Sequence, residues 1–138
     1  MGENIVAVSG GFDPVHVGHV RMIRAAATTG AVVVILNTDK WLMKKKGYVF
    51  MPFEERKEIL EGIKGVRQVV SAEDDDGTVC ISLEKVSPTH FANGGDRHFM
   101  NTPEMQVCKK YGIEMLWNVG GGKIQSSSTL VENSKEAK

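Results

Sequence analysis

Two histidines and three glycines near the start of the chain have the residue types and spacing that a phosphate-binding site requires. Gly10 and Gly11 follow a short apolar run, and glycine lets backbone amides approach a ligand closely. His16 and His19 are three positions apart, so their imidazoles would face the same way on the first turn of a helix. Gly18 between them would leave room for a ligand against the backbone. A helix that begins here would add the positive end of its dipole, so the segment predicts a site for anionic phosphate groups.

The segments that must position this site alternate between strand and helix patterns. Residues 5–8 and 31–36 are apolar runs without polar alternation, which is typical of parallel strands covered on both faces. Further strands are expected at 68–70, 90–92 and 114–117, and helices at 17–27, 52–60, 76–86, 103–111 and after Ser127 or Ser128. This alternation predicts an α/β fold, a Rossmann-like doubly wound parallel sheet of about five strands with helices on both faces. Residues 1–138 are expected to form a single domain with a frayed tail at 134–138.

Length, charge and cysteine content narrow the classes of function. Lys+Arg and Asp+Glu both total 17 in the 138 residues, so the formal net charge is zero and a uniform electrostatic grip on nucleic acid or anionic lipid is not expected. Cys80 and Cys108 lack the spacing of a zinc site or a disulfide framework. The first apolar run is too short for a signal-peptide core or a membrane span. We therefore expect a cytoplasmic protein with neither nucleic-acid nor membrane partners.

Five segments in order along the chain resemble the motifs of the cytidylyltransferase-like nucleotidyltransferases. They are His16-Val17-Gly18-His19, similar to the HxGH signature, Lys44 and Lys46 after the second strand, Pro52–Leu60 with Arg56, Asn93-Gly94-Gly95-Asp96-Arg97, and Gln125–Thr129 at the last helix. The resemblance runs from about residue 5 to residue 132. The small size most resembles glycerol-3-phosphate cytidylyltransferases and the nucleotidyltransferase domains that act on sugar phosphates.

The resemblance implies a reaction and assigns a role to each matching residue. An acceptor phosphate would attack the α-phosphate of a nucleoside triphosphate and release pyrophosphate, with Mg²⁺ accompanying the triphosphate and no metal ligand assigned on the chain. The implied catalytic residues are His16, His19, Ser127, and Lys44 and Lys46 on a loop. The implied nucleotide-binding residues are Gly10, Gly11, Phe12, Asp13, Gly18, Gly95, Asp96, Arg97, Ser126 and Ser128. Lys64 and Arg56 would bind substrate. Asp13 would either help to bind Mg²⁺ or brace the turn.

Several alternatives stay open at the level of sequence. CTP is the preferred nucleotide, ATP is the close alternative, and a non-catalytic nucleotide sensor of the same fold is a third reading. Two departures from the family pattern favour the sensor. Val131 stands in place of a basic residue, and the run Gly120–Gly122 precedes Lys123, which would supply the missing charge if the chain is an enzyme. The acceptor is a small phosphorylated alcohol or sugar whose pocket is expected from segments 39–51 and 97–103, and a homodimer is suggested by analogy. A nicotinamide oxidoreductase is disfavoured, because Gly10-Gly11-Phe12-Asp13 is not the GxGxxG pattern.

Overall fold

The chain folds around one parallel sheet, as the alternation of strands and helices predicts. The structure is a computed structural model that describes residues 3–72, 80–92 and 103–116. The strands are β1 (Ile5–Gly10), β2 (Ala31–Leu36), β3 (Val66–Ser71), β4 (His90–Ala92) and β5 (Glu114–Leu116). They are hydrogen-bonded in the order β3-β2-β1-β4-β5, and every pairing is parallel. The predicted Rossmann-like fold class is therefore confirmed.

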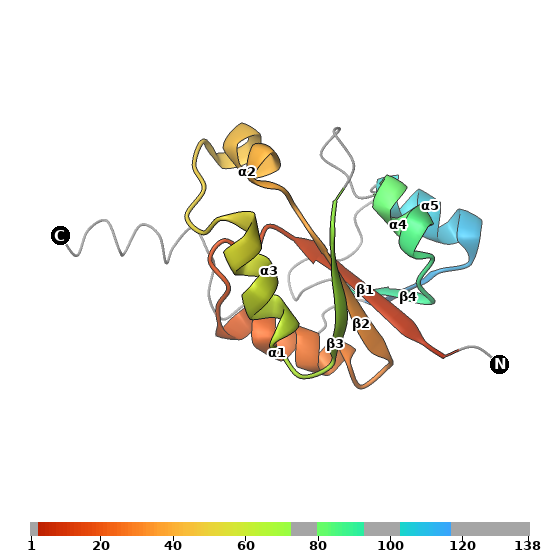
Figure 1. The fold of residues 1–138 in the computed structure, drawn as a ribbon. Coiled ribbons are helices and arrows are strands. Elements are labelled where there is room, and N and C mark those ends of the chain that lie inside the picture. Colours follow the sequence, from red (N-terminus) through yellow and green to blue (C-terminus); the bar gives the residue numbers. More distant parts are fainter. Residues whose placement is uncertain (1–2, 73–79, 93–102, 117–138) are drawn as a thin grey trace.

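Four of the five helices in the described residues form two layers, and the fifth lies beyond the end of a strand. They are α1 (Val17–Ala26), α2 (Asp39–Lys46), α3 (Phe53–Glu61), α4 (Cys80–Val86) and α5 (Pro103–Tyr111). Helices α1 and α3 cover one face of the sheet, α4 and α5 cover the other, and α2 stands beyond the end of β2 (Figure 1). None of the helices in the described ranges is long and apolar enough to span a membrane.

The two helical layers are held by two apolar clusters on opposite faces of the sheet. Alternate residues of β2 supply both, because successive side chains of a strand point to opposite faces. Val32, Val34 and Leu36 pack with Ile23 of α1 and Leu60 of α3. Ile35 packs with Leu83 of α4 and Cys108 of α5 in the second layer. The all-apolar β2 sequence is thus explained by helices on both sides.

Helix α2 occupies a segment for which a loop was expected. Thr38 caps its N-terminus by accepting a hydrogen bond from the Trp41 amide, and Asp39 lies in its first turn. Three lysines occupy its last turn, where positive charge is favourable, and Gly47 ends it with φ +83 in the left-handed region. These are ordinary helix start and stop signals. The expectation of a lysine-bearing loop was wrong, because the segment carries capping residues at both ends of a helix.

The order of the strands fixes where a ligand should bind. Strand order reverses between β1 and β4, since the chain adds β2 and β3 on one side of β1 and β4 and β5 on the other. In open parallel sheets the carboxyl ends of the strands beside such a reversal form the ligand-binding crevice. β1 leads from this edge into the segment that carries His16 and His19.

We predict that Gly65 is required by the return of the chain from α3 to β3. It has φ +102, and a Cβ there would lie 2.6 Å from the Cβ of Ala27. Gly112 is a matched control, because its φ is +69 and a Cβ there meets nothing within 4 Å. Gly112→Ala should lower the free energy of unfolding by about 1 kcal/mol through backbone strain alone. Gly65→Ala should cost roughly 1–3 kcal/mol more through overpacking, measured by urea denaturation; equal losses would contradict this account.

Candidate active site

His16 and His19 form a stacked pair that also caps helix α1. The Gly18 amide donates to His16 Nδ1 at 3.1 Å, and the His16 amide donates to His19 Nδ1 at 3.2 Å. Their ring centroids lie 3.8 Å apart with an interplanar angle of 22°. The arrangement is a capping box in which imidazole nitrogens replace the usual oxygen acceptors. The expectation that these two rings face the same way is met in the structure.

The two backbone hydrogen bonds define which nitrogen of each ring carries the proton. Because both Nδ1 atoms accept an amide N–H, the neutral form of each ring is protonated on Nε2. In this tautomer the N–H donor of each ring is Nε2. A second proton on Nδ1 would remove the acceptor that the backbone amide uses. The cap therefore prepares two neutral N–H donors at the N-terminus of a helix.

The glycines of this segment are required first by packing. A Cβ on Gly18 would lie 2.9 Å from His16 Cε1, so the absence of a side chain makes room for the His16 ring. The expectation that Gly18 leaves room for a ligand stays a prediction. A Cβ on Gly10 would lie 3.2 Å from the Phe12 ring, and one on Gly11 would lie 3.0 Å from Leu42 Cδ2.

Phe12 packs against the histidine pair. It has φ 49, which is uncommon for a residue with a side chain, and its ring is 4% exposed. The ring meets His19 edge-on, with centroids 4.7 Å apart at 66°. Phe12 thus orients an imidazole through an aromatic contact, which places it beside the pair as a positioning residue.

Asp13 is a buried brace. Its carboxylate is completely buried and accepts hydrogen bonds from the Phe50 amide at 2.7 Å and from the Met51 amide. A carboxylate held in this way is satisfied by the backbone and does not fit the role of a Mg²⁺ ligand. Of the two roles expected for Asp13, the structure supports the brace. The described residues contain no group of three or more His, Cys, Asp or Glu that could hold a metal ion.

Arg56 is the largest fully buried side chain among the described residues, and it joins four segments. Its Nε donates to the Met51 carbonyl at 2.9 Å, and one terminal nitrogen donates to the carbonyls of Gly11 and Asn37, each at 2.7 Å. The other terminal nitrogen pairs with Asp39 at 2.7 Å. These contacts correct the expectation that Arg56 binds substrate, because a guanidinium enclosed in this way positions the loops of the site instead.

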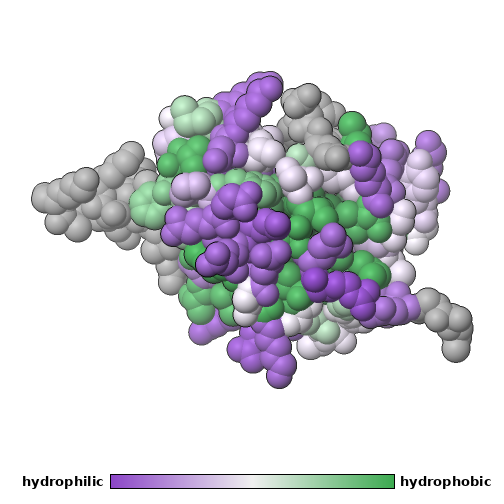
Figure 2. Space-filling model, viewed as in Figure 1, coloured by the Kyte–Doolittle hydropathy of each residue, from purple (hydrophilic) through white to green (hydrophobic). Residues whose placement is uncertain are grey.

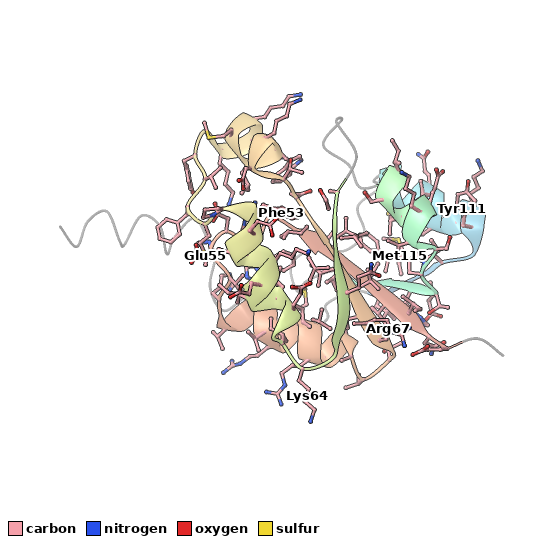
Figure 3. The ribbon with its side chains drawn as sticks, in the orientation of Figure 1. Phe53, Glu55, Lys64, Arg67, Tyr111 and Met115 are labelled. Atoms are coloured by element: carbon pink, nitrogen blue, oxygen red, sulfur yellow. The ribbon has the colours of Figure 1, made fainter. Side chains whose placement is uncertain are left out.

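The lysines separate into two groups. Lys44 and Lys46 lie in the last turn of α2, which follows the carboxyl end of β2, as the histidine segment follows the carboxyl end of β1. Lys44 is exposed and Lys46 is half-buried. Lys64 lies between α3 and β3, where the chain enters the sheet at its amino edge. Figure 3 shows Lys64 below the sheet and pointing away from it, on the side opposite α2. The expectation that Lys64 contacts substrate in the same site is therefore wrong.

Two sets of residues complete the comparison with the sequence. Gly95, Asp96, Arg97, Ser126, Ser127 and Ser128, expected in the site, lie outside the described residues, as do Gly120–Gly122, Lys123 and Val131. Asn37 and Thr38 were not among the expected site residues, and Asp39 was expected only as the start of the acceptor segment 39–51. The Asn37 amide donates to the Gly10 carbonyl at 3.0 Å, which ties the end of β2 to that of β1. Thr38 as the N-cap and Asp39 as the first residue of α2 are a recognisable helix start.

Comparison with known proteins gives a family. The family model described as cytidylyltransferase-like matches residues 7–134, so the resemblance seen in the sequence is confirmed. FAD synthase of Ferroglobus placidus is 30% identical over 109 residues, which cover 79% of this chain and 70% of that protein. The bifunctional protein HldE of Geobacter sulfurreducens is 29% identical over 136 residues, which cover 95% of this chain but 27% of HldE. The lipopolysaccharide core biosynthesis protein of Thermoplasma volcanium GSS1 shares the fold, with a TM-score of 0.70 at 20% identity over 84% of this chain and 94% of that chain.

We predict that Arg56 is essential to the stability of the site. Arg56→Met would leave three carbonyls and Asp39 without their donors, so the free energy of unfolding should fall by roughly 3 kcal/mol or more. Arg67→Met is the control, because Arg67 is exposed and pairs only at the surface with Glu3 among the interactions described. Its loss should cost about 0–1 kcal/mol. Urea denaturation measures both, and a similar loss in the two variants would show that the Arg56 contacts contribute little.

Proposed function

This chain belongs to the cytidylyltransferase-like family of nucleotidyltransferases, and from that premise we propose that it transfers a nucleoside monophosphate from a nucleoside triphosphate to a small phosphorylated alcohol or sugar. CMP is the preferred group, as the resemblance in the sequence indicates. The observation that carries the proposal is the stacked His16–His19 pair at the N-terminus of α1, because the hydrogen bonds accepted by Nδ1 put the N–H of each neutral ring on Nε2. A polyphosphate is the ligand that such a pair at a helix N-terminus suits best.

The reaction needs alignment more than acid–base chemistry. An oxygen of the acceptor phosphate forms a bond to the α-phosphorus of the triphosphate, and the bond from that phosphorus to the oxygen bridging to the β-phosphate breaks. The electron pair of the broken bond leaves with pyrophosphate. A phosphate monoester is already ionised near neutral pH, so its oxygen attacks without a general base. The protein must hold the two anions in line and offset their negative charge.

The proposed roles follow from this requirement. The Nε2–H groups of His16 and His19 donate to oxygens of the α- and β-phosphates, and these hydrogen bonds strengthen as charge develops on the leaving group. Lys44 and Lys46 add positive charge from α2. Ser126, Ser127 and Ser128 would hold the far phosphates, and Gly95, Asp96 and Arg97 the nucleoside. When bound, Mg²⁺ would offset part of the negative charge of the triphosphate.

A second candidate is an adenylyltransferase acting through the same site. It is favoured by the FAD synthase relative, whose name specifies an adenine dinucleotide product and which this chain matches over 70% of its length. Pyrophosphate release with CTP, ATP, GTP and UTP against a panel of phosphorylated acceptors separates the two. Turnover confined to CTP supports the first proposal, and turnover confined to ATP supports the second. Nucleotide binding without turnover under every condition would instead favour a nucleotide sensor.

We predict that His16 can be divided into a structural and a chemical role. His16→Asn keeps a side-chain oxygen that can accept from the Gly18 amide, so stability should change by only a few tenths of a kcal/mol, whereas His16→Ala should cost about 1 kcal/mol. Both variants lose the Nε2–H donor, so turnover should fall at least about 100-fold in each. Thermal unfolding and pyrophosphate release measure the two effects. If the His16→Asn variant retained more than about a tenth of wild-type turnover, His16 would have no role in the reaction.

A further inference from the structure

A cavity of about 440 Å³ lies against the sheet on the face that carries α4 and α5. Its floor comes from β1, β2 and the edge strand β3, and its wall comes from α4. Figure 2 shows hydrophobic surface bordered by strongly hydrophilic surface in the area between β3 and α4. His16 and His19 cap α1, which packs on the opposite face, so the cavity is separate from the candidate active site. Sites for small molecules have volumes of about 300–1,000 Å³, so a ligand would fit here.

The floor of this cavity is aliphatic. It is formed by Ile5 of β1, Val33 of β2 and Val70 of β3. Val33 belongs to neither of the two apolar clusters of the described residues, whereas Ile35 on the same face of β2 packs with α4 and α5. None of the described residues that line the cavity is aromatic. A flexible aliphatic chain suits such a floor, because its burial is favoured in proportion to the apolar area removed from water.

The charged residues of the cavity are all basic. Arg67 of β3 and Lys85 of α4 line it, and its nine described lining residues include no Asp or Glu. The whole chain has 17 basic and 17 acidic residues, so this local excess of positive charge does not follow from the composition. Gln68 and Ser71 add neutral polar groups on β3. Cations beside an aliphatic floor are complementary to a ligand that joins an anionic head to an apolar body.

Arg67 lines this cavity and already holds a carboxylate. Glu3 stands two residues before Ile5, and its carboxylate pairs with the Arg67 guanidinium. Figure 3 shows Arg67 beside the lower part of β1, away from α2. The two side chains are 46% and 56% exposed, and ion pairs as exposed as this are weak enough for another anion to replace one partner. The Glu3 carboxylate therefore marks the place where the acid group of a ligand would be held.

We propose that this cavity is a second binding site, and that its ligand is an aliphatic anion. The acid group of the ligand, a carboxylate or a phosphate, binds Arg67 and Lys85 and takes the place of Glu3. The aliphatic chain of the ligand lies on Val33 and Val70. The site does not depend on the proposed nucleotidyl transfer, because none of its described lining residues is among those expected in the active site.

The test compares four probes by calorimetry with the full chain. Octanoate and octyl phosphate have both the chain and the acid group, 1-octanol has only the chain, and acetate has only the acid group. At least one octyl anion should bind with a Kd about tenfold or more below that of 1-octanol, on the scale of a hydrogen bond to a charged group. Its Kd should be about 100-fold or more below that of acetate, because several CH₂ groups are buried. The octyl anion with the lower Kd identifies the preferred head group.

Two exposed ion pairs supply matched variants. Arg67→Gln and Lys85→Gln should each raise the Kd of the octyl anion about tenfold, because a charged donor is lost. Glu3→Gln should lower that Kd about two- to fivefold, because the competing carboxylate is removed. Lys57→Gln and Glu61→Gln are the controls and should leave the Kd unchanged, since Lys57 and Glu61 form a pair at 3.9 Å on α3, outside the cavity. Opposite effects from the two partners of one ion pair cannot arise from a general loss of folding.

Each of four results would overturn the inference. If 1-octanol bound as tightly as the octyl anions, the cations would have no part in binding. If binding survived in both Arg67→Gln and Lys85→Gln, the ligand would lie elsewhere, and if CTP displaced it, the ligand would lie in the histidine site. No binding of either octyl anion would show that the cavity takes no such ligand, as when a second copy of the chain covers this face. The transfer reaction is tested separately, by pyrophosphate release.

Discussion

The site depends on two buried charges that hold the backbone of the same residue, Met51. Asp13 accepts from the Met51 amide, and Arg56 donates to the Met51 carbonyl, while both side chains are fully buried. A buried charge is tolerated only when hydrogen bonds replace its lost hydration. Satisfying these two charges fixes the segment after α2 against the histidine segment, because the partners of Arg56 also include the Gly11 carbonyl. The hydrogen bonds that satisfy Asp13 and Arg56 therefore set the relative positions of the segments that form the site.

In the proposed reaction the hydrogen bonds of the two histidines would serve both folding and chemistry. A helix N-terminus has amides without partners, and here imidazole Nδ1 atoms accept from two of the amides at this end. That use fixes the tautomer and the direction of each ring before any ligand arrives. Preorganised donors of this kind contribute more to a transition state than donors that must first be oriented. Phe12 and Gly18 belong to the arrangement because they shape the space for the two rings.

Periodicity and motifs predicted the sheet, its parallel strands and the place of the histidines, because these follow from local sequence patterns. The burial of Arg56 and Asp13 could not be predicted, since a charged residue in a motif looks the same whether it faces solvent or carbonyl groups. Lys64 was misplaced for a different reason. In the predicted parallel sheet every helix-to-strand connection lies at the amino edge, so the topology already implied the position of Lys64, whereas its expected role came from the family resemblance. Helix α2 was missed although Thr38 and Gly47 marked its ends.

The proposed site is divided between the two sides of β1, with the nucleotide and the acceptor on different sides. Strand order reverses between β1 and β4, so the nucleotide is expected on the β4 side of the histidines. The β2 side is then left to α2 and its connection, which are tied to the core through Arg56 and Asp13 and not through their exposed side chains. Exposed residues such as Met43 and Phe50 can therefore change without disturbing the buried contacts. If the acceptor lies on this side, as expected for segment 39–51, substitutions of these exposed residues would alter acceptor preference and leave the buried hydrogen bonds in place.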